Sequence, residues 1–139
     1  MVSIVYLLIF GCTAVNGAEW VHYGKDVLGN TWYYDKEGIT SGDKESKKVW
    51  IKKVYSDKGK QELIKEATER RIYKYYGDLD YVLQLEIYNC NTKEYGMVSV
   101  TLYSTKGKRI DSTSAPLELK PIIPEGISEA LYEIVCKGR

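Results

Sequence analysis

The chain has 139 residues, and its 20 basic and 19 acidic side chains give a formal net charge of +1. This length allows a single domain, and the near-neutral charge argues against nucleic-acid binding, which usually comes with a clear basic excess. With 44% apolar and 28% charged residues, the composition is that of a globular protein and excludes disordered and collagen-like classes.

The first 18 residues, MVSIVYLLIFGCTAVNGA, contain no charged side chain. Their apolar run from Val2 to Phe10 is too short to span a bilayer, which takes about 20 apolar residues. A run of this length that ends in small residues is typical of a secretory signal peptide. The sequence therefore predicts a signal peptide at residues 1–18 and one domain at residues 19–139.

A second interpretation of the same segment is a bacterial lipoprotein signal. Ile9-Phe10-Gly11-Cys12 approximates a lipoprotein box, in which Cys12 would be lipidated and would become the first mature residue. Only this alternative attaches the protein to a membrane. Both interpretations predict an exported protein that is secreted, periplasmic or on the outer surface.

From residue 19 onward, short β-type runs alternate with turn residues, which predicts an antiparallel meander. The strongest of these runs is Tyr81–Cys90, where Tyr81, Leu83, Leu85 and Ile87 alternate with Gln84 and Glu86. Period-two alternation indicates a strand with one apolar, covered face. The predicted strands are Glu19–Tyr23, Thr31–Asp35, Lys48–Ser56, Tyr81–Cys90, Tyr95–Tyr103 and a short run through Ile110.

Two segments have helical character. Lys60–Arg71 contains strong helix formers and a Glu66–Arg70 pair, which fits a surface helix or an irregular excursion. Ile127–Val135 carries an amphipathic stripe that we expect to pack on Leu83, Leu85 and Ile87. The predicted fold class is α+β, with an antiparallel meander sheet of about six strands and a C-terminal helix packed on one face.

Removal of the signal peptide would leave two cysteines, Cys90 and Cys136. An even number of cysteines in an exported protein favours a disulfide over a metal pair or a catalytic thiol. On an ideal helix Cys136 points away from the apolar stripe, and Cys90 shares its strand face with Gln84 and Glu86. We therefore expect the helix to loosen before Cys136, or a bulge near Asn89 to turn Cys90 over.

Residues 19–137 contain an ordered set of short motifs: Glu19-Trp20-Val21, Tyr33-Tyr34-Asp35, Val49-Trp50, Leu85–Cys90, Lys106-Gly107-Lys108, Pro121-Ile122-Ile123-Pro124 and Leu131–Cys136. With this set the chain resembles the surface-adhesin protein E family of bacterial exported proteins. The resemblance implies an antiparallel sheet with a C-terminal helix fastened to it by a disulfide, here Cys90–Cys136. It also implies export, often as a lipoprotein, and binding to host matrix or serum proteins as the type member does.

Motifs for catalysis are missing from the sequence. It has one histidine, no G-x-S-x-G, no glycine-rich phosphate loop and no H-E-x-x-H. The carboxylate pairs Asp35/Glu37 and Asp78/Asp80 would formally suffice for a glycosidase, but both lie in turn-like sequence, where such residues commonly make local hydrogen bonds. We expect no catalytic residue, no cofactor and no metal site, and a small secreted hydrolase is a remote alternative.

The abundant tyrosines and the clustered basic residues suggest a protein-binding surface, although tyrosine is also an ordinary strand residue and basic side chains are commonly scattered. The leading hypothesis is an adhesin-like protein that acts by contact with a host or matrix protein. The alternative is a structural or accessory envelope protein that self-associates through a sheet edge, for example as a homodimer. The predicted binding residues are Tyr33, Tyr34, Lys52, Lys53, Arg70, Arg71, Tyr73 and Lys74.

Overall fold

The computed structural model describes residues 17–42, 45–72, 76–114 and 116–138. The predicted signal peptide up to residue 16, including Cys12, lies outside the described residues, as do Tyr73 and Lys74. Within the described ranges, no helix combines the length and the apolar character that are needed to cross a bilayer.

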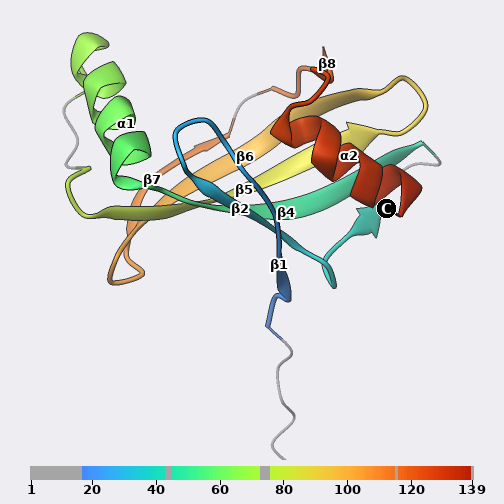
Figure 1. The fold of residues 1–139 in the computed structure, drawn as a ribbon, viewed down its shortest axis with the longest axis horizontal. Coiled ribbons are helices and arrows are strands. Elements are labelled where there is room, and N and C mark those ends of the chain that lie inside the picture. The colour runs from blue at the N-terminus through green and yellow to red at the C-terminus, as the bar shows by residue number, and fades with distance from the viewer. Residues whose placement is uncertain (1–16, 43–44, 73–75, 115, 139) are drawn as a thin grey trace, which may run out of the picture.

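The sheet is an antiparallel meander in the order β1-β2-β4-β5-β6-β7, and two short strands flank it, β3 beside β4 and β8 beside β6 (Figure 1). One helix, α1 (Asp57–Glu69), connects β4 to β5, and a second, α2 (Ile127–Lys137), follows the last strand. The predicted α+β meander with a C-terminal helix is thus confirmed. The strands are β1 (Trp20–Lys25), β2 (Thr31–Asp35), β3 (Thr40–Ser41), β4 (Ser46–Val54), β5 (Leu79–Asn89), β6 (Glu94–Ser104), β7 (Arg109–Ser114) and β8 (Lys120–Pro121).

The turn between β1 and β2 is built around the Asp26 carboxylate. It accepts hydrogen bonds from the backbone N–H groups of Leu28 and Asn30, from the Asn30 amide and from the Trp32 indole, at 2.9–3.0 Å. Burial raises the pKa of this carboxyl, but the hydrogen bonds from Asn30 and Trp32 outweigh burial and leave the pKa below its ordinary value.

The same turn is joined to the start of α1. The fully buried Asn30 accepts a hydrogen bond from the Ser56 backbone N–H at 2.9 Å, and Ser56 caps α1 by accepting from the Gly59 N–H at 2.9 Å. A serine at the N-cap supplies an acceptor to an N–H that the helix itself cannot satisfy. The region 57–69 is therefore a regular helix and not an irregular excursion.

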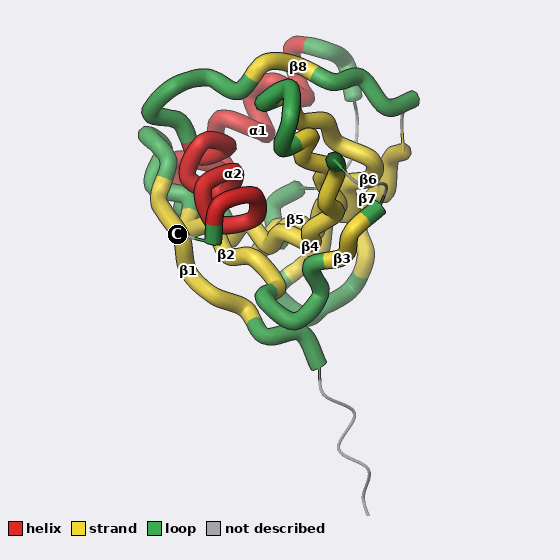
Figure 2. The backbone as a smooth tube through the Cα atoms, turned by 90° about the vertical axis from the view of Figure 1, so that its right-hand side faces the viewer, coloured by secondary structure: helices red, strands yellow, loops and turns green. Residues whose placement is uncertain are grey.

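Both helices lie on one side of the sheet, which curves around them (Figure 2). We call this side the covered face. The side chains of α2 pack with Tyr34, Val49, Ile51 and Tyr88, whereas α1 packs at the other end of the same face, through Ala67 against Tyr76 and Leu79.

The prediction that α2 packs on Leu83, Leu85 and Ile87 was wrong. These three residues are half-buried on the opposite face of β5, and the positions that the helices cover are Val82, Gln84, Glu86 and Tyr88, all at most 5% exposed. The polar side chains Gln84 and Glu86 tolerate this burial because Gln84 donates a hydrogen bond to Glu86, which also accepts one from the Tyr88 hydroxyl.

The disulfide between Cys90 and Cys136 fastens α2 to the end of β5, with the two Cα atoms 5.4 Å apart, as predicted. The rearrangement that we expected at Cys136 or Asn89 does not occur. The helix runs through Cys136 to Lys137, and the register of β5 against both neighbours is regular from Glu86 to Asn89. Because α2 lies on the face of Glu86, Cys90 already points toward it.

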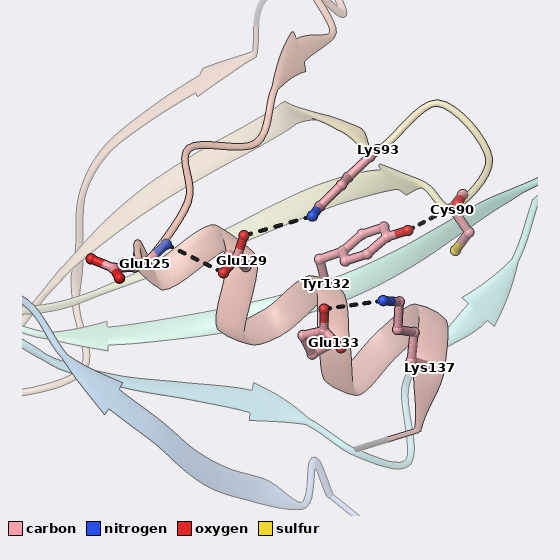
Figure 3. Close-up of polar contacts among 7 residues, drawn as sticks. All are labelled: Cys90, Lys93, Glu125, Glu129, Tyr132, Glu133 and Lys137. Atoms are coloured by element: carbon pink, nitrogen blue, oxygen red, sulfur yellow. Dashed lines mark hydrogen bonds and ion pairs between the residues drawn. The ribbon is translucent and has the colours of Figure 1, made fainter.

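Polar contacts reinforce this attachment (Figure 3). The Tyr132 hydroxyl donates to the Cys90 carbonyl oxygen at 3.0 Å, and the Tyr132 ring lies between the Lys93 and Lys137 ammonium groups, 5.5 and 5.8 Å from its centroid. Lys93 also pairs with Glu129 at 3.7 Å, which joins the β5–β6 turn to the first turn of α2.

Candidate binding surface

The face of the sheet that turns away from the helices carries a continuous set of aromatic and aliphatic side chains. Cross-strand pairing places Tyr33, Lys52 and Leu83 in one row and Trp50 beside Leu85 in the next. All members of the set are half-buried or exposed, and Trp50 is 40% exposed. We call this set the open face; it comprises His22, Tyr33, Lys48, Trp50, Lys52, Tyr81, Leu83, Leu85, Ile87 and Tyr103.

Contacts between neighbouring rings order the open face. His22 meets Tyr33 edge-on with centroids 5.5 Å apart, and Tyr81 stacks on Tyr103 at 5.0 Å. The Lys52 ammonium lies 4.5 Å from the centroid of the Tyr81 ring. Side chains that already hold one another lose less rotamer freedom when a partner binds, so this arrangement favours association.

The charge of the open face is basic. Its charged members are Lys48, which is exposed opposite Ile87, and Lys52. A lysine above an aromatic ring presents both a positive charge and an apolar stem.

The structure separates the predicted binding residues into three groups. Tyr33 and Lys52 are cross-strand neighbours on the open face, whereas the adjacent Tyr34 and Lys53 belong to the covered face. Tyr34 is buried in the core, and Lys53 lies between the rings of Trp32 and Tyr55, at 5.0 and 4.8 Å from their centroids.

The remaining predicted residues lie elsewhere. Arg70 and Arg71 are exposed at the end of α1, where Arg70 pairs with Glu66 at 3.8 Å, and Tyr73 and Lys74 lie outside the described residues. Burial lowers the pKa of Lys53. This effect agrees with the position of Lys53 under α1, where it is shielded from solvent.

Glu86 is a deeply buried carboxyl with a raised pKa. It accepts hydrogen bonds from Gln84 Nε2 and from the Tyr88 hydroxyl, each at 2.8 Å. Burial raises its pKa to about 7, and these hydrogen bonds offset only part of that effect. No ion pair joins Glu86 to a basic side chain in the described part of the chain; the nearby Lys47 donates instead to the Val135 carbonyl at 3.0 Å.

The two carboxylate pairs considered for catalysis have structural contacts. Asp35 accepts from the Glu19 backbone N–H at 3.0 Å, and Asp78 accepts from the Thr105 hydroxyl. Glu37 is fully exposed, and a hydrogen bond with Glu19 together with the charge of that residue raises its pKa. The described ranges hold no group of three His, Cys, Asp or Glu side chains placed to bind a metal ion.

Sequence reasoning missed most of the open face because it assigned Leu83, Leu85 and Ile87 to the core. It also missed Trp50, whose neighbour Val49 is fully buried. The position of Cys90 could have revealed the error. If Cys90 forms a disulfide with the C-terminal helix, the helix must lie on the strand face that carries Cys90. That face also carries Glu86.

Comparison with known proteins agrees with this architecture. The sequence model of the family described as surface-adhesin protein E matches residues 20–137. Among solved structures, the chain is similar to protein E from non-typeable Haemophilus influenzae, with 18% identity and a TM-score of 0.53, over 90% of this chain and 79% of that one. No curated protein matches the sequence.

Proposed function

The chain belongs to the surface-adhesin protein E family, and we propose that it is an exported surface protein that binds an extracellular protein through its open face. The observation that carries the proposal is the exposure of aromatic and aliphatic side chains on strands whose other face forms the core. In a monomer such a face remains partly exposed to solvent, and large apolar patches of this kind commonly mark interaction sites.

The chemistry of the open face defines the class of partner. Trp50, Leu85 and Ile87 offer apolar contact, and Lys48 and Lys52 lie beside them. Burial of the rings would supply most of the affinity, whereas the two lysines would select an acidic segment and accelerate the encounter. We therefore propose a host matrix or serum protein with an acidic, apolar segment as the partner.

The test is saturable binding of the purified domain to a panel of matrix and serum glycoproteins, measured by surface plasmon resonance. Trp50→Ser should weaken binding by roughly tenfold or more, as expected for an aromatic anchor, and Lys52→Glu should weaken it and change its salt dependence. Lys58→Glu is the matched control, since it makes the same charge change at an exposed position on α1.

If Lys52→Glu and Lys58→Glu lose the same amount of affinity, the net charge of the protein, and not the open face, governs binding. If no member of the panel binds, the adhesin proposal fails. In that case the exposed edge of β7, which pairs with β6 on its other side, favours self-association, and size-exclusion chromatography would then show a dimer or a larger species.

We also propose that residues 1–18 are removed on export and that residues 19–139 form the mature domain. The family membership supports a surface or secreted location. Mass spectrometry of the exported protein distinguishes the two signal interpretations, because cleavage near residue 18 gives an unmodified chain, whereas processing at Cys12 gives a longer chain with the added mass of lipid.

A further inference from the structure

A cavity of about 250 Å³ lies between the covered face of the sheet and the start of α2. One wall is formed by Tyr88 and Tyr95, whose rings stack with centroids 5.7 Å apart, and another by Trp32. Glu86 lines the same cavity. Ile123, which is 69% exposed, stands at its mouth.

The carboxyl oxygens of Glu86 can accept further hydrogen bonds from a ligand. Each of its oxygens accepts one hydrogen bond, from Gln84 or from Tyr88, and a carboxylate oxygen can accept two. The donors that it has are neutral, so the described side chains do not compensate its charge when it ionises. A buried carboxylate without a counter-charge is costly, and its position on a cavity wall means that a bound cation can supply the charge.

The rings around Glu86 select the kind of cation. The faces of aromatic rings carry negative electrostatic potential, and Trp and Tyr side chains around a carboxyl form the environment in which proteins hold alkylated ammonium groups. The cavity is large enough for a few carbon atoms and one charged nitrogen, but too small for an extended ligand. A hydrated metal ion would find a single carboxyl and few other oxygen donors here, which does not suit it.

We infer that the cavity bounded by Trp32, Glu86, Tyr88 and Tyr95 binds a compact alkylammonium group, with Glu86 as its anionic partner. This site is on the opposite side of the sheet from the open face, so it does not depend on the proposed adhesin function. The ammonium group can come from two sources of identical chemistry: a free small amine, or a lysine side chain of a bound protein.

The raised pKa of Glu86 gives the site a characteristic dependence on pH. An alkylammonium group keeps its charge up to about pH 10, so between pH 5.5 and 8 the change in affinity comes from the protein. Burial raises the pKa values of the nearby phenols of Tyr23 and Tyr88. The cationic side chains on this face are Lys47, which donates to the Val135 carbonyl, and Lys53, whose ammonium lies 5.0 Å from the Trp32 ring centroid. Binding should therefore strengthen as Glu86 loses its proton.

The experiment is a titration of the domain with n-butylammonium chloride, followed by heteronuclear NMR shifts at pH 8 and pH 5.5. We expect saturable shifts of cavity residues at pH 8 and affinity lower by roughly tenfold or more at pH 5.5. Glu86→Gln should abolish binding, and Glu129→Gln, which removes a carboxylate that pairs with Lys93 and does not line the cavity, should retain it. Ile123→Trp, which fills the mouth and leaves Glu86 in place, should also reduce binding if Glu86→Gln proves poorly folded.

A parallel titration with Nα-acetyl-lysine methylamide distinguishes the two origins: binding of both probes supports a protein lysine, and binding of butylammonium alone supports a free amine. The inference is overturned if cavity shifts do not saturate at pH 8, or if they persist unchanged in Glu86→Gln. Because Trp50 and Lys52 do not line this cavity, variants at those positions should leave butylammonium binding intact, and a failure of the adhesin proposal remains distinguishable.

Discussion

The Tyr132 hydroxyl donates a hydrogen bond to the carbonyl oxygen of Cys90 at 3.0 Å, and Cys90 is the residue whose sulfur is bonded to Cys136. A covalent bond and a hydrogen bond thus hold α2 to the same residue at the end of β5. The position of α2 in turn decides which face of the sheet is covered and which is left open.

Replacement of both cysteines, Cys90→Ser with Cys136→Ser, should lower the free energy of unfolding by about 3–4 kcal/mol, because the bridge closes a long loop in the unfolded chain. The sequence separation that it spans is 46 residues. Urea denaturation of the wild type and the double variant would measure the difference. A reducing agent should shift the wild-type transition to that of the variant and leave the variant unchanged; equal midpoints in all cases would contradict a stabilising bridge.

Glu86→Gln should stabilise the protein at pH 8. The folded-state pKa of Glu86 is about 7, above its ordinary value of 4.5, so the folded protein retains a proton that the unfolded chain releases. The stability contribution of the protonated carboxyl is complete below about pH 4.5, decreases as the pH rises to about 7 and is absent above that. The difference between variant and wild type at pH 8 should approach about 3 kcal/mol.

Denaturation curves of both proteins at pH 4.5, 6 and 8 would check this, since subtraction removes the titration of all other groups. Near pH 4.5 the two proteins should have similar stability. A wild-type stability that changes with pH as that of Glu86→Gln does would show that Glu86 has no raised pKa. Glu62→Gln, at an exposed position on α1, serves as the control for loss of one carboxylate.

Gly59→Ala should destabilise the protein although it lies within α1, where alanine is usually better than glycine. A Cβ at this position would collide with the side-chain amide of Asn30, which is fully buried and hydrogen-bonded to the cap of α1. Overpacking of this kind costs about 1–3 kcal/mol. Thermal denaturation of the variant, with the exposed neighbour Lys58→Ala as control, measures the effect.

The same position allows a double-mutant cycle. If the collision with Asn30 is the cause, Gly59→Ala should cost much less in an Asn30→Ala background, because the obstructing amide is gone. Equal costs in the two backgrounds would assign the loss to another contact.

Val49 and Trp50 are adjacent in sequence and lie on opposite faces of β4. Val49→Ala should cost about 2 kcal/mol because it opens a cavity in a fully buried site, whereas Trp50→Ala should cost about 1 kcal/mol or less. Chemical denaturation of the two variants compares the faces directly. A larger loss for Trp50→Ala would mean that the open face is part of the core of the folded protein.

Most of the strands were predictable because β-branched and aromatic runs and the turns between them are local features. The predicted Thr31–Asp35 coincides with β2, and Ile127 is the first residue of α2 as predicted. The short strands β3 and β8 lacked any such signal, since two residues that pair with a distant strand leave no pattern in the sequence.

The assignment of the two faces of β5 was not predictable from hydrophobicity. The alternation of Leu83, Leu85 and Ile87 with Gln84 and Glu86 correctly indicates a strand. The more apolar of its two faces, however, is the one that remains partly exposed to solvent. The position of α2 decides which face of β5 is buried, and that position depends on the disulfide bond to Cys90. The predicted pairing of Tyr33 with Tyr34 and of Lys52 with Lys53 on one surface was incompatible with a strand, because consecutive residues point to opposite faces.

The contact between Gly24 of β1 and Ile127 of α2 has a consequence for the order of folding. A side chain at Gly24 would lie 2.9 Å from the Ile127 side chain, so the first strand and the last helix meet closely. The covered face cannot close until the whole domain is available, and contacts between such distant segments form slowly. During synthesis the incomplete domain therefore keeps its covered face open until α2 is available.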